Sequence, residues 1–280
     1  MRRITEIVRD IDMSRANRQV FSTGLDNLDR SLDGGFFRKE LVVLGAPTGS
    51  GKSYVAGQIM LTIARQGYRT AYFSLEISAE MIVSRLIGQI ADLQASLISH
   101  GTLSPSAQVK KAHAVGVLKG YEAYMDFYDD LYQWGELKQA LLKERYDFAV
   151  IDFIQNIDIP GMEEYPKLSF VTKAIQKTAK EINGTILLVS QLSNVIARMP
   201  GSDQTVEYRG SGAIGHAADL GFMLIRDHES NTAQLALKKS RRSVSFTKTD
   251  YLISPNGQYF YDFDKAGAYA HPLGSLQRPR

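Results

Sequence analysis

The sequence contains no cysteine, which excludes disulfide bonds, zinc sites built on thiolates and cysteine nucleophiles together. It also lacks any apolar run near the roughly 18 residues that a membrane-spanning helix needs. Its first residues, MRRITEIVRD, contain no apolar secretory core. The formal net charge of +3 is too small to identify a nucleic-acid binder from bulk electrostatics. We therefore expect a soluble, cytoplasmic protein with no membrane partner, whose ligands have to be inferred from local motifs.

The apolar pattern predicts an α/β fold. Short apolar runs alternate with helix-length amphipathic stretches, which favours a mostly parallel central sheet flanked by helices. The runs cover residues 41–45, 70–75, 148–152 and 185–190. Aromatic residues between 121 and 134 indicate a further strand and helix packed on the core, although they could also stack bases. Beyond Gly221, short segments separated by turn residues predict antiparallel strands at the C-terminal end.

A phosphate-binding loop is the strongest single motif. The stretch GAPTGSGKS, residues 45–53, lies between an apolar strand and a helical pattern, which is the context that a P-loop requires. Its glycines allow consecutive N–H groups to surround phosphates, and the helix N-terminus adds a positive dipole end. Alanine stands where the strict pattern has its first glycine. The residues expected to bind ATP are Ala46, Pro47, Thr48, Gly49, Ser50, Gly51, Lys52 and Ser53, with Ser53 also ligating Mg²⁺.

Three polar residues that follow other apolar runs are candidates for hydrolysis. Ligands of open parallel sheets bind beyond the carboxyl ends of the strands, and Glu76, Asp152 and Gln191 all stand at such ends. We expect Asp152 to hold Mg²⁺, Glu76 to activate water and Gln191 to sense the γ-phosphate. Purely structural roles remain open: a helix N-terminal acid, a strand-end cap and a turn residue, respectively.

These motifs together resemble those of a known family. GAPTGSGKS, YFSLE, VIDFIQ, LVSQLSN, RGSGAIGHAADL and KKSRR occur in the order, and at roughly the spacing, found in DnaB-type replicative helicases. The similarity covers about residues 22–255 and implies a RecA-like P-loop ATPase motor, with residues 1–22 forming a helical linker and 23–280 the motor domain. It also implies a homohexameric ring on single-stranded DNA, and it supports Glu76 as the catalytic base.

The resemblance adds two further groups of residues. Lys239 and Arg241 match a Lys-x-Arg pair that reaches into the neighbouring subunit's ATP site in the family, although Lys238 or Arg242 could act instead, or the segment could be a solvated strand end. Arg209, Gly210 and Gly212 match a segment that contacts the backbone of single-stranded DNA in the central channel. The family usually has an acid where Gly210 stands, and a surface loop without a ligand is the alternative.

Two other functions use the same fold. A recombinase or mediator would form filaments on single-stranded DNA, and a loader scaffold would use ATP as a ligand with little turnover. The family generally carries an N-terminal domain that contacts primase, whereas this sequence begins almost at the motor. We therefore expect either a compact phage or mobile-element protein or part of a longer one, with primase and a helicase loader as candidate partners.

Overall fold

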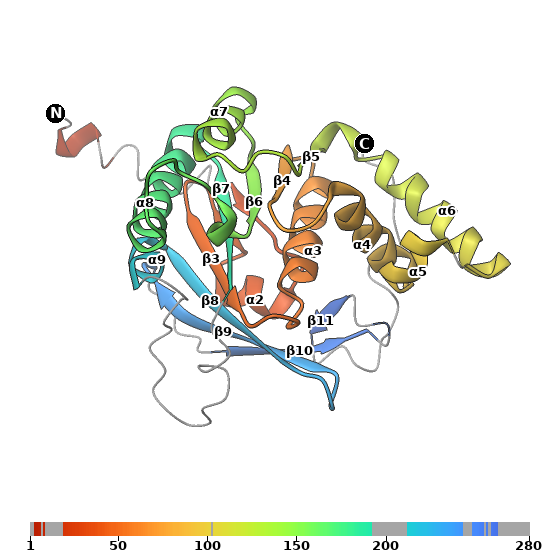
Figure 1. Cartoon of the computed structure of the whole chain (residues 1–280). Helices are drawn as coiled ribbons and strands as arrows, with labels where there is room; N and C mark the ends of the chain where they lie inside the picture. The colour runs from red at the N-terminus through yellow and green to blue at the C-terminus, as the bar shows by residue number, and fades with distance from the viewer. Residues whose placement is uncertain are drawn as a thin grey trace.

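The computed structural model describes residues 3–6, 8, 19–101, 103–191, 212–242, 248–254, 256 and 259–262. Within these ranges, a nine-stranded sheet has the order β11-β10-β9-β8-β3-β7-β6-β4-β5 (Figure 1). The strands are β1 (Val20–Phe21), β2 (Phe36–Phe37), β3 (Leu41–Ala46), β4 (Thr70–Ser74), β5 (Met125–Tyr128), β6 (Phe148–Asp152), β7 (Thr185–Gln191), β8 (Leu220–Asp227), β9 (Thr232–Ser240), β10 (Lys248–Ile253) and β11 (Phe260–Asp262). The helices are α2 (Asp26–Ser31), α3 (Lys52–Arg65), α4 (Ala79–Ala91), α5 (Ala95–His100), α6 (Pro105–Lys119), α7 (Trp134–Glu144), α8 (Glu164–Ile182) and α9 (Gly212–Ala217), with 3₁₀ turns η1 (Glu122–Tyr124) and η2 (Ile154–Asn156). None of the helices in the described ranges is long and apolar enough to cross a membrane.

The parallel strands form the buried centre of the molecule. Strands β8, β3, β7, β6, β4 and β5 pair in parallel. Every residue of β3, β4 and β6 is buried, because helices cover both faces of the sheet. Burial on both faces explains why these strands read as continuous apolar runs instead of alternating ones. The four strands predicted from these runs are confirmed. The further strand predicted in the aromatic segment is β5.

The C-terminal strands pair in antiparallel fashion, as the sequence predicts. Strand β8 runs parallel to β3 on one side and antiparallel to β9 on the other. Strands β10 and β11 continue the antiparallel part. Side chains of β10 alternate between exposed and buried at their first four positions, which is the pattern of a strand with one solvated face. The predicted fold class is therefore confirmed.

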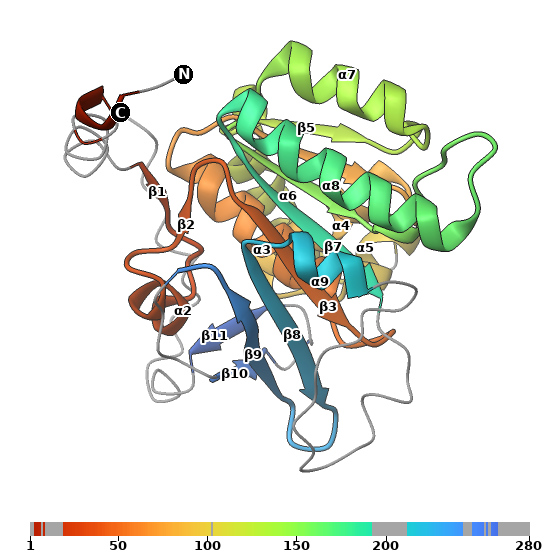
Figure 2. The ribbon, with the colours of Figure 1, turned by 90° about the vertical axis from the view of Figure 1, so that its left-hand side faces the viewer.

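Helices cover the two faces of the sheet in separate groups (Figure 2). Helices α3 to α6 pack on one face, together with α2 and β1. Helices α7, α8 and α9 pack on the other face. Phe21 is fully buried in the first group, so β1 belongs to the body of the domain although its residues lie within the predicted linker.

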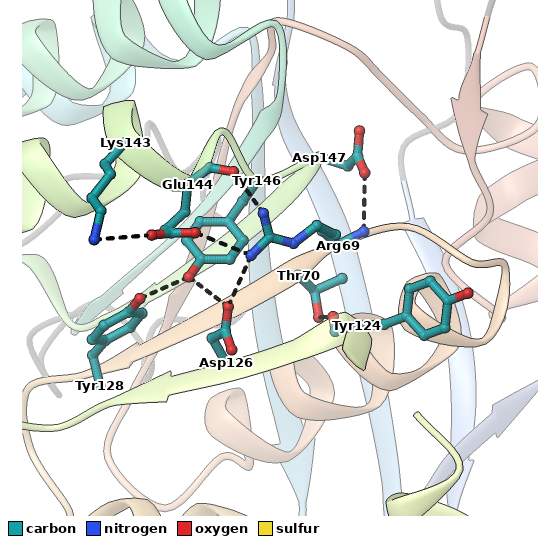
Figure 3. A network of polar contacts seen from close by, with 9 residues as sticks. All are labelled: Arg69, Thr70, Tyr124, Asp126, Tyr128, Lys143, Glu144, Tyr146 and Asp147. Atoms are coloured by element: carbon teal, nitrogen blue, oxygen red, sulfur yellow. Dashed lines mark hydrogen bonds and ion pairs between the residues drawn. The ribbon is translucent and has the colours of Figure 1, made fainter. Parts of the chain in front are cut away.

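A polar network closes the edge of the sheet at which the parallel strands begin, here called the amino edge (Figure 3). The guanidinium of Arg69 lies 3.2 Å from Glu144 and 3.4 Å from Asp126, and its backbone N–H donates to Asp147 at 2.9 Å. The hydroxyl of Tyr146 donates to Asp126 at 2.7 Å. Burial, followed by hydrogen bonds with neighbouring groups, raises the pKa of Tyr146, so this hydroxyl remains a donor. The network ties β4, β5, α7 and β6 together at the edge opposite the P-loop.

A buried ion pair fixes the end of β9. The Nε of Arg242 donates to Glu40 Oε1 at 2.6 Å, and a second guanidinium nitrogen binds Oε2 of the same carboxylate. Arg242 Nη1 donates to the carbonyl oxygens of Leu32 and Gly35 at 2.9 and 3.0 Å. Both charged side chains are only 12% exposed, and the guanidinium lies 3.3 Å from the centre of the Phe37 ring. Arg242 therefore joins the end of β9 to the segment before β3.

Replacement Arg242→Ala is expected to lower the free energy of unfolding by roughly 3 kcal/mol or more, because it removes the ionic partner of the buried Glu40 carboxylate. Urea denaturation at neutral pH measures this change. Lys177→Ala is the control, because Lys177 is 76% exposed and its pairing with Glu181 at 3.7 Å stabilises little. Equal effects of the two replacements would contradict the structural role of Arg242.

Candidate nucleotide-binding site

The P-loop, residues 45–53, joins β3 to α3 at the carboxyl edge of the sheet, where the parallel strands end. Gly49 and Gly51 have φ angles of +82° and +91°, which favour glycine. A Cβ atom at Gly51 would also lie 2.9 Å from the Phe260 ring. Ala46 is instead the last residue of β3 and is fully buried. The first position of the motif therefore lies in an extended strand that accommodates a methyl group, which explains the alanine.

Lys52 begins α3 and provides a largely buried positive charge. It is 7% exposed, and its Nζ lies 5.6 Å from the centre of the Phe153 ring. Burying an ammonium group is costly unless an opposite charge approaches it. The turn of the P-loop, closed by a bond of 3.3 Å from Ser50 N to Pro47 O, leads directly to this charge. The arrangement suits an anion such as a phosphate, which the N-terminus of α3 would also favour.

Asp152, the last residue of β6, has the geometry of a metal ligand. It is 2% exposed, and its Oδ2 accepts a hydrogen bond of 2.7 Å from the Tyr72 hydroxyl. Its Oδ1 is buried and receives no hydrogen bond from the described residues. A buried carboxylate oxygen without a donor is unfavourable unless a cation binds it. Carboxylate oxygen is a preferred Mg²⁺ ligand, so the residues present fit this ion.

Mg²⁺ at this position would depend on the nucleotide. Across the described ranges, no group of three histidine or acidic side chains could hold a metal by itself. Mg²⁺ is commonly bound by one or two protein oxygens together with substrate phosphates and water. Asp152 and the half-buried Ser53 are suitable protein ligands. Both form a hydrogen bond with the Tyr72 hydroxyl, so they lie close together.

Tyr72, in the middle of β4, was not identified from the sequence. Burial, and then the nearby Asp152 carboxylate, raise the pKa of its phenol well above the usual range, while Arg85 and Ser53 act in the opposite direction. The hydroxyl therefore stays protonated and keeps donating to Asp152. Arg85 reaches the same region from α4, with its guanidinium 4.9 Å from the centre of the Tyr54 ring. The available signal was a tyrosine within the otherwise apolar run before Glu76.

Glu76 follows β4 at the same edge of the sheet as Asp152. The register pairs Ser74 with Asp152. Leu75 N donates to Asp152 O at 2.7 Å, and Asn156 Nδ2 donates to Leu75 O at 2.7 Å. These bonds attach the loop that carries Glu76 to the end of β6, while the Glu76 side chain remains exposed.

Gln191 ends β7 and touches the P-loop directly. It pairs in register with Ala46, and its Nε2 donates to Thr48 Oγ1 at 2.7 Å. Gln155, which the sequence analysis did not single out, supports it: Gln155 Nε2 donates to Ser190 Oγ at 3.1 Å, and Gln155 Oε1 accepts from Gln191 N at 3.4 Å. A ligand that displaced Thr48 of the P-loop would therefore alter a hydrogen bond made by Gln191, the last residue of β7.

Lys239 and Arg241 lie away from the P-loop of their own chain. Lys239 Nζ and Arg241 Nη2 both donate to the carbonyl oxygen of His216, the latter at 3.0 Å. Arg241 Nη1 lies 2.9 Å from Asp219, whose carboxylate also accepts from Leu41 N at the start of β3. Burial and the neighbouring Arg241 lower the pKa of Lys239. The pair thus sits toward the amino edge, whereas ATP would bind at the carboxyl edge.

The remaining predicted residues are only partly described. Arg209 and Gly210 lie outside the described ranges, and Gly212 is the first residue of α9. Of the two alternatives to Arg241, Arg242 is held by its buried pair with Glu40, and Lys238 is exposed on β9.

The sequence is similar to those of known proteins. Residues 21–253 match the family described as DnaB-like helicase C terminal domain. The replicative DNA helicase DnaB of Treponema pallidum is 29% identical over 251 residues, covering 85% of this chain and 56% of that protein. The DnaB of Geobacillus stearothermophilus is 29% identical over 220 residues, covering 75% and 48%. The chain thus spans about half the length of these curated relatives.

Solved structures agree on the fold. One that is described as an ATPase domain superimposes with a TM-score of 0.78 at 18% identity, covering 92% of this chain and 96% of that one. A DnaB-like replicative helicase, reported with its interactions with primase, gives 0.80 at 17% identity, covering 93% and 67%. Because the family match extends over most of the chain and both neighbours share its fold, the chain belongs to the DnaB-like helicase C-terminal domain family.

Proposed function

We propose that this chain is the ATP-hydrolysing motor of a ring-forming replicative DNA helicase. The observation that carries the proposal is the convergence of the P-loop, Glu76, Asp152 and Gln191 at one edge of the sheet. In this proposal the set supplies a phosphate site, a metal ligand, an acid and a residue that contacts the P-loop, which are the parts that nucleotide hydrolysis needs. Two relatives that are 29% identical are replicative DNA helicases by name.

Each residue of the ATP site receives a specific role in this proposal. Lys52 binds the β- and γ-phosphates, while Ser53 and Asp152 hold Mg²⁺, which supplies charge neutralisation at the phosphates when bound. Tyr72 fixes Asp152 so that Oδ1 stays available to the ion. Glu76 accepts a proton from the attacking water, and Gln191 reports the γ-phosphate through its bond to Thr48.

The neighbouring subunit completes the site in this proposal. Lys239 and Arg241 are too far toward the amino edge to reach the P-loop of their own chain, yet Arg241 is 47% exposed. An arginine supplied to the transferring phosphate is worth roughly 10³ to 10⁵ in rate. Hydrolysis would then require assembly, and a homohexameric ring with ATP between subunits satisfies this requirement.

DNA and protein partners follow from the same family. We propose that Arg209, Gly210 and Gly212 bind the backbone of single-stranded DNA in the channel, through charge and exposed N–H groups. Such contacts do not read base sequence. Because one similar structure is described with its interactions with primase, we include primase, and a helicase loader, among the candidate partners.

Unwinding of forked DNA tests the proposal as a whole. The protein is expected to displace a strand from forked DNA in the presence of ATP and Mg²⁺. It should require a single-stranded tail, and substrates with only a 5′ or only a 3′ tail would reveal the polarity of translocation. Electron microscopy with an ATP analogue and single-stranded DNA should show closed rings. Filaments without strand displacement would instead favour a recombinase, and turnover that DNA does not stimulate would favour a loader scaffold.

A mixture of two variants tests whether Glu76 acts in the ATP site of its own subunit and Arg241 acts in the ATP site of the neighbour. Glu76→Gln and Arg241→Ala variants are each expected to bind ATP and to hydrolyse it at least roughly 10³-fold more slowly. Mixing the two variants should restore turnover, because a pocket with intact Glu76 can then receive Arg241 from a Glu76→Gln neighbour. Steady-state ATPase measured against the mixing ratio gives the result. Normal turnover by Glu76→Gln alone would refute the base, and failure of mixing to restore activity would refute action in trans.

Replacement Tyr72→Phe tests the metal site. Asp152 would lose the donor to Oδ2 and would be free to rotate, so the Mg²⁺ concentration needed for half-maximal ATPase is expected to rise by roughly tenfold. The replacement removes only a hydroxyl, so thermal unfolding should change little. Tyr128→Phe, which removes the hydroxyl 2.7 Å from Tyr146 at the amino edge, is the control. An unchanged Mg²⁺ dependence in Tyr72→Phe would contradict the assignment.

A further inference from the structure

Asp219, in the turn between α9 and β8, connects three parts of the fold. Its Oδ2 accepts from Leu41 N at 2.9 Å, at the start of the strand that leads to the P-loop. Its Oδ1 accepts from Arg241 Nη1 at 2.9 Å and from Gln176 Nε2 on α8 at 3.3 Å. Arg241 N also donates to Asp219 O at 2.8 Å. Both the backbone and the side chain of Arg241 are therefore attached to this one residue.

Helix α9 supplies the second support for Arg241. The carbonyl oxygen of His216, near the end of the helix, accepts from Arg241 Nη2 at 3.0 Å and from Lys239 Nζ. The last carbonyl groups of a helix carry partial negative charge and lack partners within the helix. The helix begins at Gly212, only four residues earlier, which corresponds to roughly 6 Å along its axis.

The charge of Asp219 is what makes this support stable. Lys239 and Arg241 are two cations that share one carbonyl oxygen, and they repel each other. A carboxylate at 2.9 Å from Arg241 offsets this repulsion, and a hydrogen bond between charged groups is roughly twice as strong as one between neutral groups. Because the Asp219 side chain is only 15% exposed, solvent screens it little. Without the negative charge, the repulsion between the two cations at this carbonyl oxygen would no longer be offset by Asp219.

We propose that Asp219, together with the His216 carbonyl, positions Arg241 for the neighbour's ATP and transmits to it the displacement of α9 when DNA contacts Gly212. This inference rests on the proposed function. Asp219 touches neither ATP nor DNA in this account, so it is a positioning residue. The path is short and continuous: Gly212 starts α9, His216 lies near its end, and both His216 and Asp219 bind Arg241.

The chain contains a closely matched control. Asp147 precedes β6 as Asp219 precedes β8, and it likewise accepts a backbone N–H, from Arg69 at 2.9 Å, and an arginine, Arg38, at 2.6 Å (Figure 3 shows the first bond). It lies in the polar network of the amino edge, and strands β8, β3 and β7 separate β9, which precedes Arg241, from β6. Asp147→Asn therefore removes the same kind of charge and contacts without altering the support of Arg241.

The experiment compares Asp219→Asn, Arg241→Ala, the double variant and Asp147→Asn in the full chain. Asparagine keeps an oxygen for Leu41 N but loses the charge that holds Arg241. ATPase kcat and KM are measured with and without oligo-dT, and thermal unfolding is followed in parallel. Asp219→Asn is expected to lower the DNA-stimulated kcat by roughly 10- to 100-fold, as for a displaced catalytic group, with KM for ATP within about twofold of the wild type. The stimulation by oligo-dT should fall toward one.

The double variant separates positioning from a merely structural role. If Asp219 acts through Arg241, Asp219→Asn causes no further loss of kcat in the Arg241→Ala background. Asp147→Asn should keep wild-type kcat and DNA stimulation. Equal losses in both backgrounds, a similar loss in Asp147→Asn, or full DNA stimulation in Asp219→Asn would each overturn the proposal. Normal kcat in Arg241→Ala would overturn the trans finger itself, whereas an inactive Arg241→Ala with a fully active Asp219→Asn would overturn the positioning role alone.

Discussion

Parallel pairing of the central strands is the constraint on which the site depends. Because β3, β7, β6 and β4 run in the same direction, their last residues meet at one edge, and the pairings of Ala46 with Gln191 and of Ser74 with Asp152 set how far each loop extends. A shift of one residue in either register would turn the side chains to the opposite face. The buried apolar runs that fix these registers are therefore as important to the chemistry as the polar residues that follow them.

Two adjacent arginines illustrate how position in the fold gives neighbouring charges different surroundings. Arg242 is held in a buried pair with Glu40 and binds two carbonyl groups, so its charge is fully used within the subunit. Arg241 lies on the surface and is attached to Asp219 and His216 at moderate exposure. His216 lies within α9 and Asp219 directly follows this helix, whereas Glu40 precedes β3. Neighbours in sequence thus contact different parts of the molecule, and the Arg241 side chain is 47% exposed whereas that of Arg242 is 12% exposed.

Much of the fold could be predicted from the sequence, because strands buried on both faces leave continuous apolar runs and the short C-terminal strands are separated by turn residues. The carboxyl ends of those runs also located Glu76, Asp152 and Gln191. Partners that act through tertiary contact could not be predicted. Tyr72 is one aromatic residue among several apolar ones, and its bond to Asp152 depends on the pairing of β4 with β6.

The P-loop and α3 are supported by contacts with a distant part of the chain. Gln58 on α3 donates to Phe260 O at 2.8 Å and accepts from Phe260 N at 3.0 Å, across 202 residues, while the Phe260 ring lies against Gly51. During synthesis, the ribosome must therefore add about two hundred residues after α3 before Phe260 can contact this helix. Until then a nascent chain carries the complete P-loop motif without the strand β11 that supports it. The affinity of the P-loop for nucleotide should therefore reach its final value only late in translation.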